Sequence, residues 1–290
     1  MRLWIALFVV IFAPSAAIAS STGPQPLPFT VTAQHMIEVP VVVGAGAAHP
    51  FLLDTGGGVD VMSMRLVTEL HGRPTGAFSG FRLTGERLDL ELYTVPELRL
   101  GTVVEKNALV AGWGGLDRLH VAGILSLTFF RNHPFTLDMR SKRLFFEDGG
   151  SLRVRRARGS TAPIRLDDLR GISLDLFAPF TLDGHKALCE VDTGSQGYMF
   201  ALRYMKMLGL RPGGPGVQDM QATSILGHRE QRYLAPVASI RLAGTGIAAA
   251  GASSALFEDL IYDCDVGMDF FQNRTVTFDI PSRQLIVSAE

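Results

Sequence analysis

The sequence predicts an all-β protein made of two similar lobes, and three observations support this prediction. Apolar segments are mostly short and rich in Val, Ile and Thr, as is typical of strands, and helix candidates are few. The segment FFRNHPFTLDMRSKRLFF (129–146) returns as FFQNRTVTFDIPSRQLIV (270–287), with seven of eighteen positions identical. An Asp-Thr-Gly begins 75 residues before the first copy and 78 before the second. The same order at nearly the same spacing indicates a duplicated unit.

The elements expected in the two units follow one plan of hairpin, Asp-Thr-Gly, short helix and further strands. In the first unit, strands are predicted at 28–33, 36–43, 51–54 and 88–101, a turn at 44–50 and a helix at 63–70. In the second unit, strands are predicted at 172–180, 186–192 and 233–244, a turn at 182–185 and a helix at 200–208 that ends near Gly209.

The chain divides into a signal peptide at 1–19, an N-terminal lobe at 20–148, a linker at 149–163 and a C-terminal lobe at 164–290. Arg2, an apolar run at 3–13 and Ala17-Ile18-Ala19 form the pattern of a secretory signal. The run is short for a membrane span, and an uncleaved N-terminal anchor is the alternative. Export predicts a periplasmic or secreted protein.

The linker is rich in Gly, Ser and Arg and has little apolar periodicity. We expect it to be a solvated loop, and a processing site is the alternative because of its four arginines. These are Arg153, Arg155, Arg156 and Arg158.

The composition argues against several function classes. The chain has 27 basic and 28 acidic residues, a formal net charge of −1, so no basic face for nucleic acid is expected. The seven histidines form no pair at metal-binding helical spacing. The run VVVGAGAAH (41–49) lacks the third glycine and the helix of a dinucleotide site. We therefore predict no cofactor, no metal, no nucleic-acid partner and no membrane partner after signal removal.

The duplicated Asp-Thr-Gly predicts a pair of catalytic carboxyl groups, Asp54 and Asp192. Cleaving an amide with water alone requires a base that activates the water and an acid that protonates the product. Two adjacent carboxyl groups supply both, because they do not ionise together readily and share one proton. A pseudo-two-fold axis between the two copies would bring the two aspartates face to face.

This pattern resembles the aspartic proteases, in which each of two lobes supplies an Asp-Thr-Gly. The resemblance covers nearly all of residues 36–289 and includes a later segment, Ile124-Leu125-Ser126 in the first copy and Asp265-Val266-Gly267 in the second. It implies two pseudo-symmetric retropepsin-like β-barrel lobes in one chain, so a monomer is sufficient. It also implies catalysis by the two aspartates, with supporting roles for Thr55, Gly56, Thr193, Gly194 and Ser195.

Two departures from the family pattern affect the expected site. Gly57 follows the first Asp-Thr-Gly, where many relatives carry a hydroxyl, whereas the second copy keeps Ser195. Because a donated hydroxyl hydrogen bond favours ionisation, Asp54 is expected to be the more readily protonated aspartate. Ser126 replaces an expected glycine and puts the geometry of the first loop in question.

The resemblance also implies hairpin flaps over the cleft. The candidates are 78–85, with Phe78, Gly80, Thr84 and Gly85, and 224–227, with Ser224 and Gly227. The first candidate lacks the tyrosine of a pepsin-type flap, so a more retropepsin-like closure is expected.

Two cysteines occur, Cys189 and Cys264. In the family's fold their strands run side by side beneath the catalytic loop, so a disulfide in the second lobe is expected in an oxidising compartment. Two buried free thiols are the alternative.

The function that this sequence predicts is an exported aspartic-type endopeptidase acting on peptides or proteins. A non-catalytic or narrowly specific periplasmic peptide-binding protein on the same fold is the alternative, since fold does not fix activity.

Overall fold

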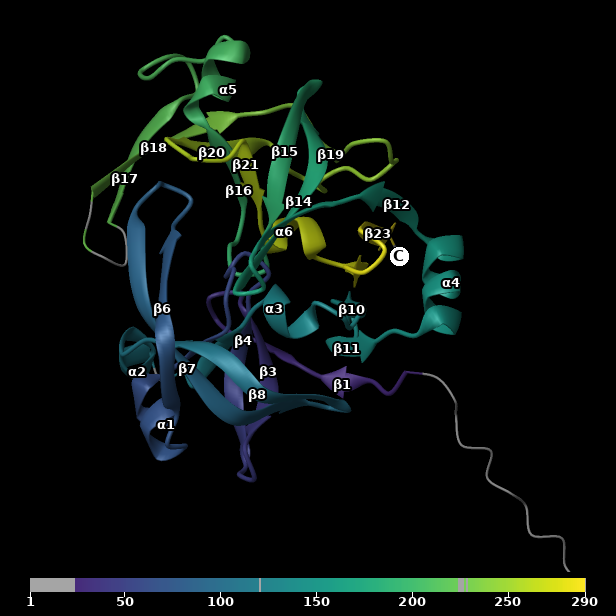
Figure 1. The fold of residues 1–290 in the computed structure, drawn as a ribbon. Coiled ribbons are helices and arrows are strands. Elements are labelled where there is room, and N and C mark those ends of the chain that lie inside the picture. Colours follow the sequence, from purple (N-terminus) through teal and green to yellow (C-terminus); the bar gives the residue numbers. More distant parts are fainter. Residues whose placement is uncertain (1–23, 120, 224–226, 228, 290) are drawn as a thin grey trace, which may run out of the picture.

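The computed structural model describes residues 24–119, 121–223, 227 and 229–289 (Figure 1). The predicted signal peptide and Ser224 lie outside the described residues. The described strands form three sheets, one in each lobe and one to which both halves of the chain contribute. The alternation along the strands shows why they form: in β3, Ile37, Val39, Val41 and Val43 are buried, and the residues between them are more exposed.

The first-lobe sheet comes from residues 30–125. Its strands, in spatial order, are β2 (Thr30–Val31), β3 (Ile37–Val43), β4 (Ala48–Leu53), β9 (Gly123–Leu125), β5 (Val61–Met62), β8 (Val103–Gly112), β7 (Arg87–Leu100) and β6 (Arg73–Phe81). The short β9 is parallel to β4 and antiparallel to β5, so it lies between the strand that precedes the first Asp-Thr-Gly and the strand that follows it.

The second-lobe sheet repeats this order around its own Asp-Thr-Gly. Its strands are β13 (Arg165–Leu169), β14 (Ser173–Leu182), β15 (His185–Val191), β21 (Cys264–Val266), β16 (Tyr198–Ala201), β20 (Ser254–Glu258), β18 (Arg229–Pro236) and β17 (Gln218–Thr223), with β19 (Ile240–Leu242) paired to β14. Here β21 is parallel to β15 and antiparallel to β16, as β9 is to its neighbours.

The third sheet joins the two halves through the segments that the sequence repeats. Its strands are β1 (Leu27–Pro28), β11 (Arg143–Phe146), β10 (Phe135–Asp138), β22 (Arg274–Asp279), β23 (Gln284–Ala289) and β12 (Ser160–Pro163). Thr136 pairs with Thr277, its own counterpart in the repeat, and their hydroxyl oxygens are 2.7 Å apart. The pseudo-two-fold axis therefore passes between these two threonines.

Six short helices complete the described fold: α1 (Met64–Glu69), α2 (Gly115–Leu119), α3 (Leu127–Phe130), α4 (Gly149–Arg158), α5 (Leu202–Met207) and α6 (Met268–Phe271). Helix α1 begins after Ser63, whose hydroxyl accepts the Leu66 amide hydrogen. Helix α5 ends at Met207, Leu208 is its C-cap, and Gly209 follows with a φ of 69°. Within the described residues, no helix is long and apolar enough to cross a membrane.

The prediction that the linker at 149–163 is a solvated loop is wrong. Residues 149–158 form α4, and β12 follows directly. Asp148 caps the helix in a capping box with Ser151. Arg155 binds the carboxylate of Glu147 and Arg156 that of Asp279, and both acidic side chains are buried. The cap and the two ion pairs thus stabilise α4, although the segment has too little apolar periodicity to predict a helix.

Two strand predictions also need correction. The expected strand at 233–244 is interrupted, because β18 ends at Pro236 and β19 begins only at Ile240. The expected strand at 28–33 forms only the two short pieces β1 and β2, which belong to different sheets.

Candidate active site

The two Asp-Thr-Gly motifs lie directly after β4 and β15. The Asp54 amide donates a 3.0 Å hydrogen bond to the Leu125 carbonyl, and the Asp192 amide donates one of the same length to the Val266 carbonyl. Each aspartate is thus held by the short strand that lies beside its own strand. The same backbone connection occurs in both lobes.

Thr55 and Thr193 join the lobes beneath the aspartates. The Thr55 hydroxyl donates to the Val191 carbonyl (2.6 Å) and accepts the Thr193 amide hydrogen (3.0 Å). In return, the Thr193 hydroxyl donates to the Leu53 carbonyl (2.8 Å) and accepts the Thr55 amide hydrogen (3.0 Å). Both side chains are buried, so these four bonds fix the two loops without competition from water.

Gly56 and Gly194 are required because the opposite carboxyl group lies against them. A Cβ atom at Gly56 would lie 2.5 Å from the Asp192 Cγ, and one at Gly194 would lie 2.4 Å from the Asp54 Cγ. Neither glycine has a positive φ. The close approach of the aspartates, rather than an unusual turn, therefore explains these glycines.

The two carboxyl groups lie within hydrogen-bonding reach of each other, and the pKa of Asp54 is raised more strongly than that of Asp192. Burial raises the pKa of both aspartates, and the pKa of Asp54 is raised well above its usual value because the neighbouring Asp192 adds to the effect of burial. Asp192 Oδ1 accepts the Gly194 amide at 2.6 Å and the Gly56 amide at 3.2 Å, whereas Asp54 Oδ1 accepts only the Gly56 amide, at 3.1 Å.

This direction agrees with the sequence-based expectation, but its cause is different. The hydroxyl of Ser195 lies beside Gly267 and close to Asp265, and its effect is on the pKa of Asp265. The hydrogen bond with Asp54 and the two backbone amides, rather than a serine hydroxyl, favour the ionised form of Asp192.

Two buried acids beside the dyad were missed by the sequence analysis. Glu190 on β15 is the register partner of Asp265 on β21, and both side chains are buried. Burial and the surrounding carboxyl groups raise the pKa of each well above its usual value. The available signal was an acidic residue inside each of two otherwise apolar segments, Glu190 in the predicted strand 186–192 and Asp265 in Asp265-Val266-Gly267.

The first flap candidate is the hairpin of β6 and β7, which rises from the first lobe toward the second (Figure 1). Thr84 and Gly85 lie in its turn, and Gly85 has a φ of 80°. The Leu83 carbonyl accepts the amide hydrogen of Ile261 in the second lobe at 2.8 Å. The tip of this hairpin is therefore tied to the opposite lobe.

Phe78 and Gly80 lie on β6, away from the tip. Phe78 packs on an apolar cluster built from β5, β7, β8 and α2, with Val59, Val61, Leu92, Ala111 and Leu116 at its centre. This cluster gives the first lobe an apolar wall under the hairpin. In the second flap candidate, Gly227 is exposed with a φ of 89°, and Ser224 lies outside the described residues.

Ser126, which replaces the expected glycine, is accommodated by a hydrogen-bonded turn. Its hydroxyl caps α3 by accepting the Thr128 amide hydrogen (3.2 Å). Asp60 Oδ1 accepts both the Ser126 amide hydrogen (2.6 Å) and its hydroxyl hydrogen (3.1 Å). The loop therefore keeps its connection to Asp54 through the preceding residue.

Cys189 and Cys264 form a disulfide between β15 and β21. Such bonds are typical of oxidising compartments. Among the described residues, no group of three or more His, Cys, Asp or Glu is arranged to hold a metal ion.

Comparisons with known proteins identify the fold. No family model matches the sequence, and no curated protein matches it. Conglutin gamma, a basic 7S globulin from lupine seeds, matches with a TM-score of 0.55 at 11% identity, over 91% of this chain and 94% of that one. The chain has the pepsin-like bilobal fold. Basic 7S globulin from soybean (TM-score 0.51, 9% identity, 91% and 94% covered) and edgp (0.57, 8%, 93% and 96%) match it as well. Identities this low describe the fold alone.

Proposed function

We propose that this chain is an aspartic endopeptidase that hydrolyses peptide bonds with a water molecule activated between Asp54 and Asp192. The observation that carries this proposal is the intact dyad: a half-buried Asp54 and a buried Asp192 within hydrogen-bonding reach, on loops locked by reciprocal threonine bonds. Such a pair supplies a base and an acid at the same point.

In this proposal Asp54, whose pKa is raised well above its usual value, carries the proton that the pair shares, and Asp192 is ionised. Ionised Asp192 accepts a proton from the water as its oxygen attacks the peptide carbonyl carbon, and Asp54 donates its proton to the carbonyl oxygen. In the second step the proton now on Asp192 passes to the departing amine, and Asp54 recovers a proton from the tetrahedral carbon's hydroxyl. The buried setting strengthens each of these interactions because little water competes.

The cleft would favour a substrate with apolar side chains. The partly buried members of the apolar wall beneath the first hairpin include Phe78, Leu90, Trp113 and Ile124. The hairpin tip, tied to the second lobe, would hold an extended peptide against this wall. A peptide or protein substrate and a monomeric enzyme remain our proposal.

A second candidate is a binding protein on the same fold, either without activity or specific for few substrates. The structural comparisons favour it more directly than they favour catalysis, because two of the three matched proteins described above are named as 7S globulins and none of the three is named as a peptidase. The same cleft would then bind a peptide without cleaving it.

We further propose that the chain is exported to a periplasm or secreted and that the lobes divide at 20–148 and 164–290. The disulfide between Cys189 and Cys264 supports export, because such bonds persist in oxidising compartments. The sequence of residues 1–19 supports it independently.

The deciding experiment is a cleavage assay on unfolded protein and a mixed peptide library between about pH 3 and 7, where a shared-proton dyad titrates. Wild type, Asp54→Asn and Asp192→Asn are compared, with and without pepstatin. We expect each substitution to lower kcat by about a thousandfold or more. Asp148→Asn, which keeps a capping residue on α4, is the matched control and should retain activity.

The outcomes separate the two functions. Cleavage that survives in both dyad variants would contradict the proposed mechanism. A folded wild type that binds library peptides but cleaves none would leave the binding protein as the function.

A further inference from the structure

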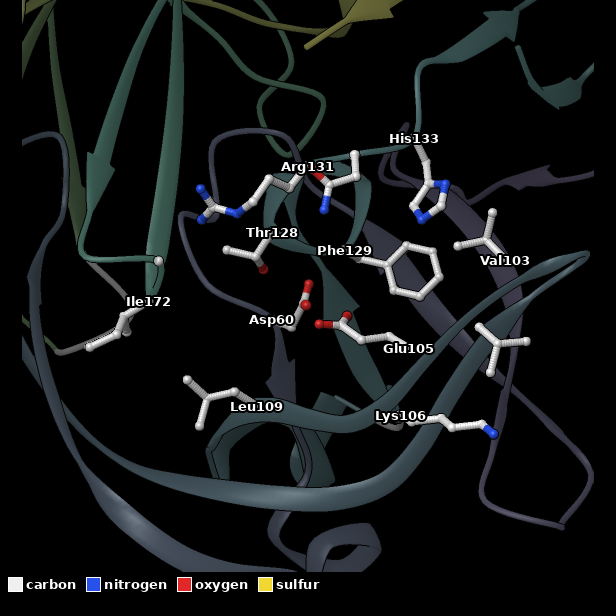
Figure 2. A pocket seen from close by; sticks show the side chains of 13 residues that line it. Asp60, Val103, Glu105, Lys106, Leu109, Thr128, Phe129, Arg131, His133 and Ile172 are labelled. Atoms are coloured by element: carbon white, nitrogen blue, oxygen red, sulfur yellow. The ribbon is translucent and has the colours of Figure 1, made fainter. Parts of the chain in front are cut away.

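A cavity of about 320 Å³ lies in the first lobe and its border with the second, away from the dyad. Residues of β8, the segment that follows α3 and the turn before β14 line it, and no residue of either Asp-Thr-Gly does. Figure 2 shows the carboxyl groups of Asp60 and Glu105 pointing toward each other in its middle.

Two acidic groups therefore face each other in this cavity. Asp60 is buried, with one carboxyl oxygen bound to Ser126, and burial raises its pKa to about 7, with a further contribution from Glu105. Glu105 Oε2 is buried and has no hydrogen-bond partner in the described part of the chain. Burial raises the pKa of Glu105 as well.

The neighbouring basic side chains do not compensate this pair fully. Arg131 forms an ion pair with Asp168, and its Nη2 has no hydrogen-bond partner among the described residues. Lys106 is exposed, and its ammonium group points away from both carboxyl groups (Figure 2). Besides the pair itself, the charged or titratable side chains around the cavity are Lys106 of β8, Arg131 and His133 after α3, and Asp168 of β13, which is bound to Arg131. Arg131 lowers the pKa of Glu105, but burial raises it more.

We propose that this cavity binds a small organic ammonium ion, whose amino group lies between Asp60 and Glu105. An ammonium group donates up to three hydrogen bonds and would satisfy the free oxygen of Glu105 while compensating both carboxylates. The apolar side chains of Val103, Leu109 and Ile172 line the same cavity and suit a short carbon chain. A bare metal ion fits less well, because two carboxyl groups in so large a space supply too few ligands.

The Nη2 group of Arg131, which has no hydrogen-bond partner among the described residues, narrows the class of ligand further. A buried donor without a partner favours a ligand that also carries an acceptor, such as a hydroxyl or carbonyl oxygen. An amino alcohol or an amino-acid derivative has both groups, with the ammonium placed toward the carboxylates and the acceptor toward Arg131.

The test uses three probes of similar size: 2-aminoethanol, propylamine and ethylene glycol. Binding is followed by the NMR shift of the Ser126 amide, because this amide donates to Asp60 and reports on its charge. At pH 8 we expect saturable shifts with the two amines, larger affinity for 2-aminoethanol, and no saturable shift with ethylene glycol. At pH 5.5 the amines should bind about tenfold more weakly or worse, because Asp60 is then largely protonated.

A variant identifies the site without disturbing the bonds of Asp60 to Ser126. Glu105→Gln should weaken 2-aminoethanol binding by about tenfold or more at pH 8. Glu69→Gln, an exposed glutamate paired with Arg65 on α1, is the matched control and should not change it. Equal shifts with ethylene glycol, unchanged binding in Glu105→Gln, or no shift with any probe would each overturn the proposal.

Discussion

The same strand pair is fastened in different ways in the two lobes. In the second lobe, Cys189 on β15 and Cys264 on β21 are register partners and form a disulfide. In the first lobe the equivalent partners, three residues before Asp54 and Ser126, are Phe51 and Gly123. A Cβ at Gly123 would lie 2.1 Å from the Phe51 ring, so the aromatic ring lies directly on the glycine. A covalent bond therefore joins the two strands in the second lobe, whereas in the first lobe they are held at this position by packing of the ring on the glycine.

The next pair of positions differs in charge. Leu52 and Ile124 are half-buried partners in the first lobe, whereas Glu190 and Asp265 are buried partners in the second. The duplicated backbone thus supports an apolar pair beside one aspartate and an acidic pair beside the other. Both lobes keep the hydrogen bond that the aspartate amide donates to a carbonyl of the neighbouring short strand, and this bond holds each aspartate.

The third difference is the placement of serine and glycine at two facing positions. Gly57 follows the first Asp-Thr-Gly and Ser126 ends the facing strand segment, whereas Ser195 and Gly267 occupy the equivalent places in the second lobe. A Cβ at Gly267 would lie 2.4 Å from the Ser195 hydroxyl oxygen. In the second lobe this contact therefore has room for one side chain, which comes from Ser195, whereas in the first lobe a Cβ at Gly57 would meet the Asp54 carboxyl group at 3.3 Å.

The largest effect is expected from opening the disulfide. Replacing Cys189 and Cys264 by Ala should lower the free energy of unfolding by about 4 kcal/mol, because the bond closes a loop of 75 residues in sequence. Transferring the first-lobe solution, Cys189→Phe with Cys264→Gly, should recover part of this loss. Urea denaturation measures both. A double alanine variant within about 1 kcal/mol of wild type would mean that packing alone holds the second strand pair.

The acidic pair is expected to make the protein less stable as the pH rises. Glu190, Asp265 and Asp60 have raised pKa values in the folded protein, so the folded state binds more protons than the unfolded state above about pH 4. The free energy of unfolding should therefore be highest near pH 4 to 5 and fall toward pH 7, with a slope of up to about 1.4 kcal/mol per pH unit for each such group.

The first lobe supplies the matched variant for this pH dependence. Glu190→Leu with Asp265→Ile introduces the residues of the first-lobe pair and should flatten the slope between pH 5 and 7. Urea denaturation at several pH values gives the comparison. An unchanged slope would assign the pH dependence to other carboxyl groups.

The exchange of side chains at the facing contact predicts a rescue. Gly267→Ala should cost about 1–3 kcal/mol, because the new methyl group overlaps the Ser195 hydroxyl. Adding Ser195→Gly removes only the hydroxyl part of this overlap, because the backbone carbonyl carbon and oxygen of residue 195 would still lie 2.7 Å from the new Cβ. The double variant should therefore recover part of the lost stability, whereas Ser195→Gly alone should cost little. Thermal denaturation of wild type, the two single variants and the double variant measures the coupling between the two positions. If the two substitutions simply add, the overlap is not the cause.

The sequence was sufficient for the fold because its strongest signals are local and doubled. The repeat at 129–146 and 270–287 and the two Asp-Thr-Gly motifs mark the halves, and alternation along 36–43 predicts the strand there. Helix α4 was missed because its arginines bind carboxylates that are buried only in the folded protein, Glu147 nearby and Asp279 far along the chain. Glu190, Asp265 and Asp60 were missed because burial of an acid depends on what covers it in three dimensions.

The threonines at the axis offer the most sensitive comparison of the two lobes. Thr55→Val and Thr193→Val each remove one donated and one accepted hydrogen bond from a buried site, so each should cost about 1–3 kcal/mol. Because the bonds are reciprocal and both side chains are buried, the two losses should agree within about 0.5 kcal/mol. Urea denaturation of both variants tests this, with Thr68→Val on the exposed face of α1 as the control. Unequal losses would show that the lobes, although joined by matching bonds, do not contribute equally to holding the dyad, and the costlier threonine would identify the lobe that dominates.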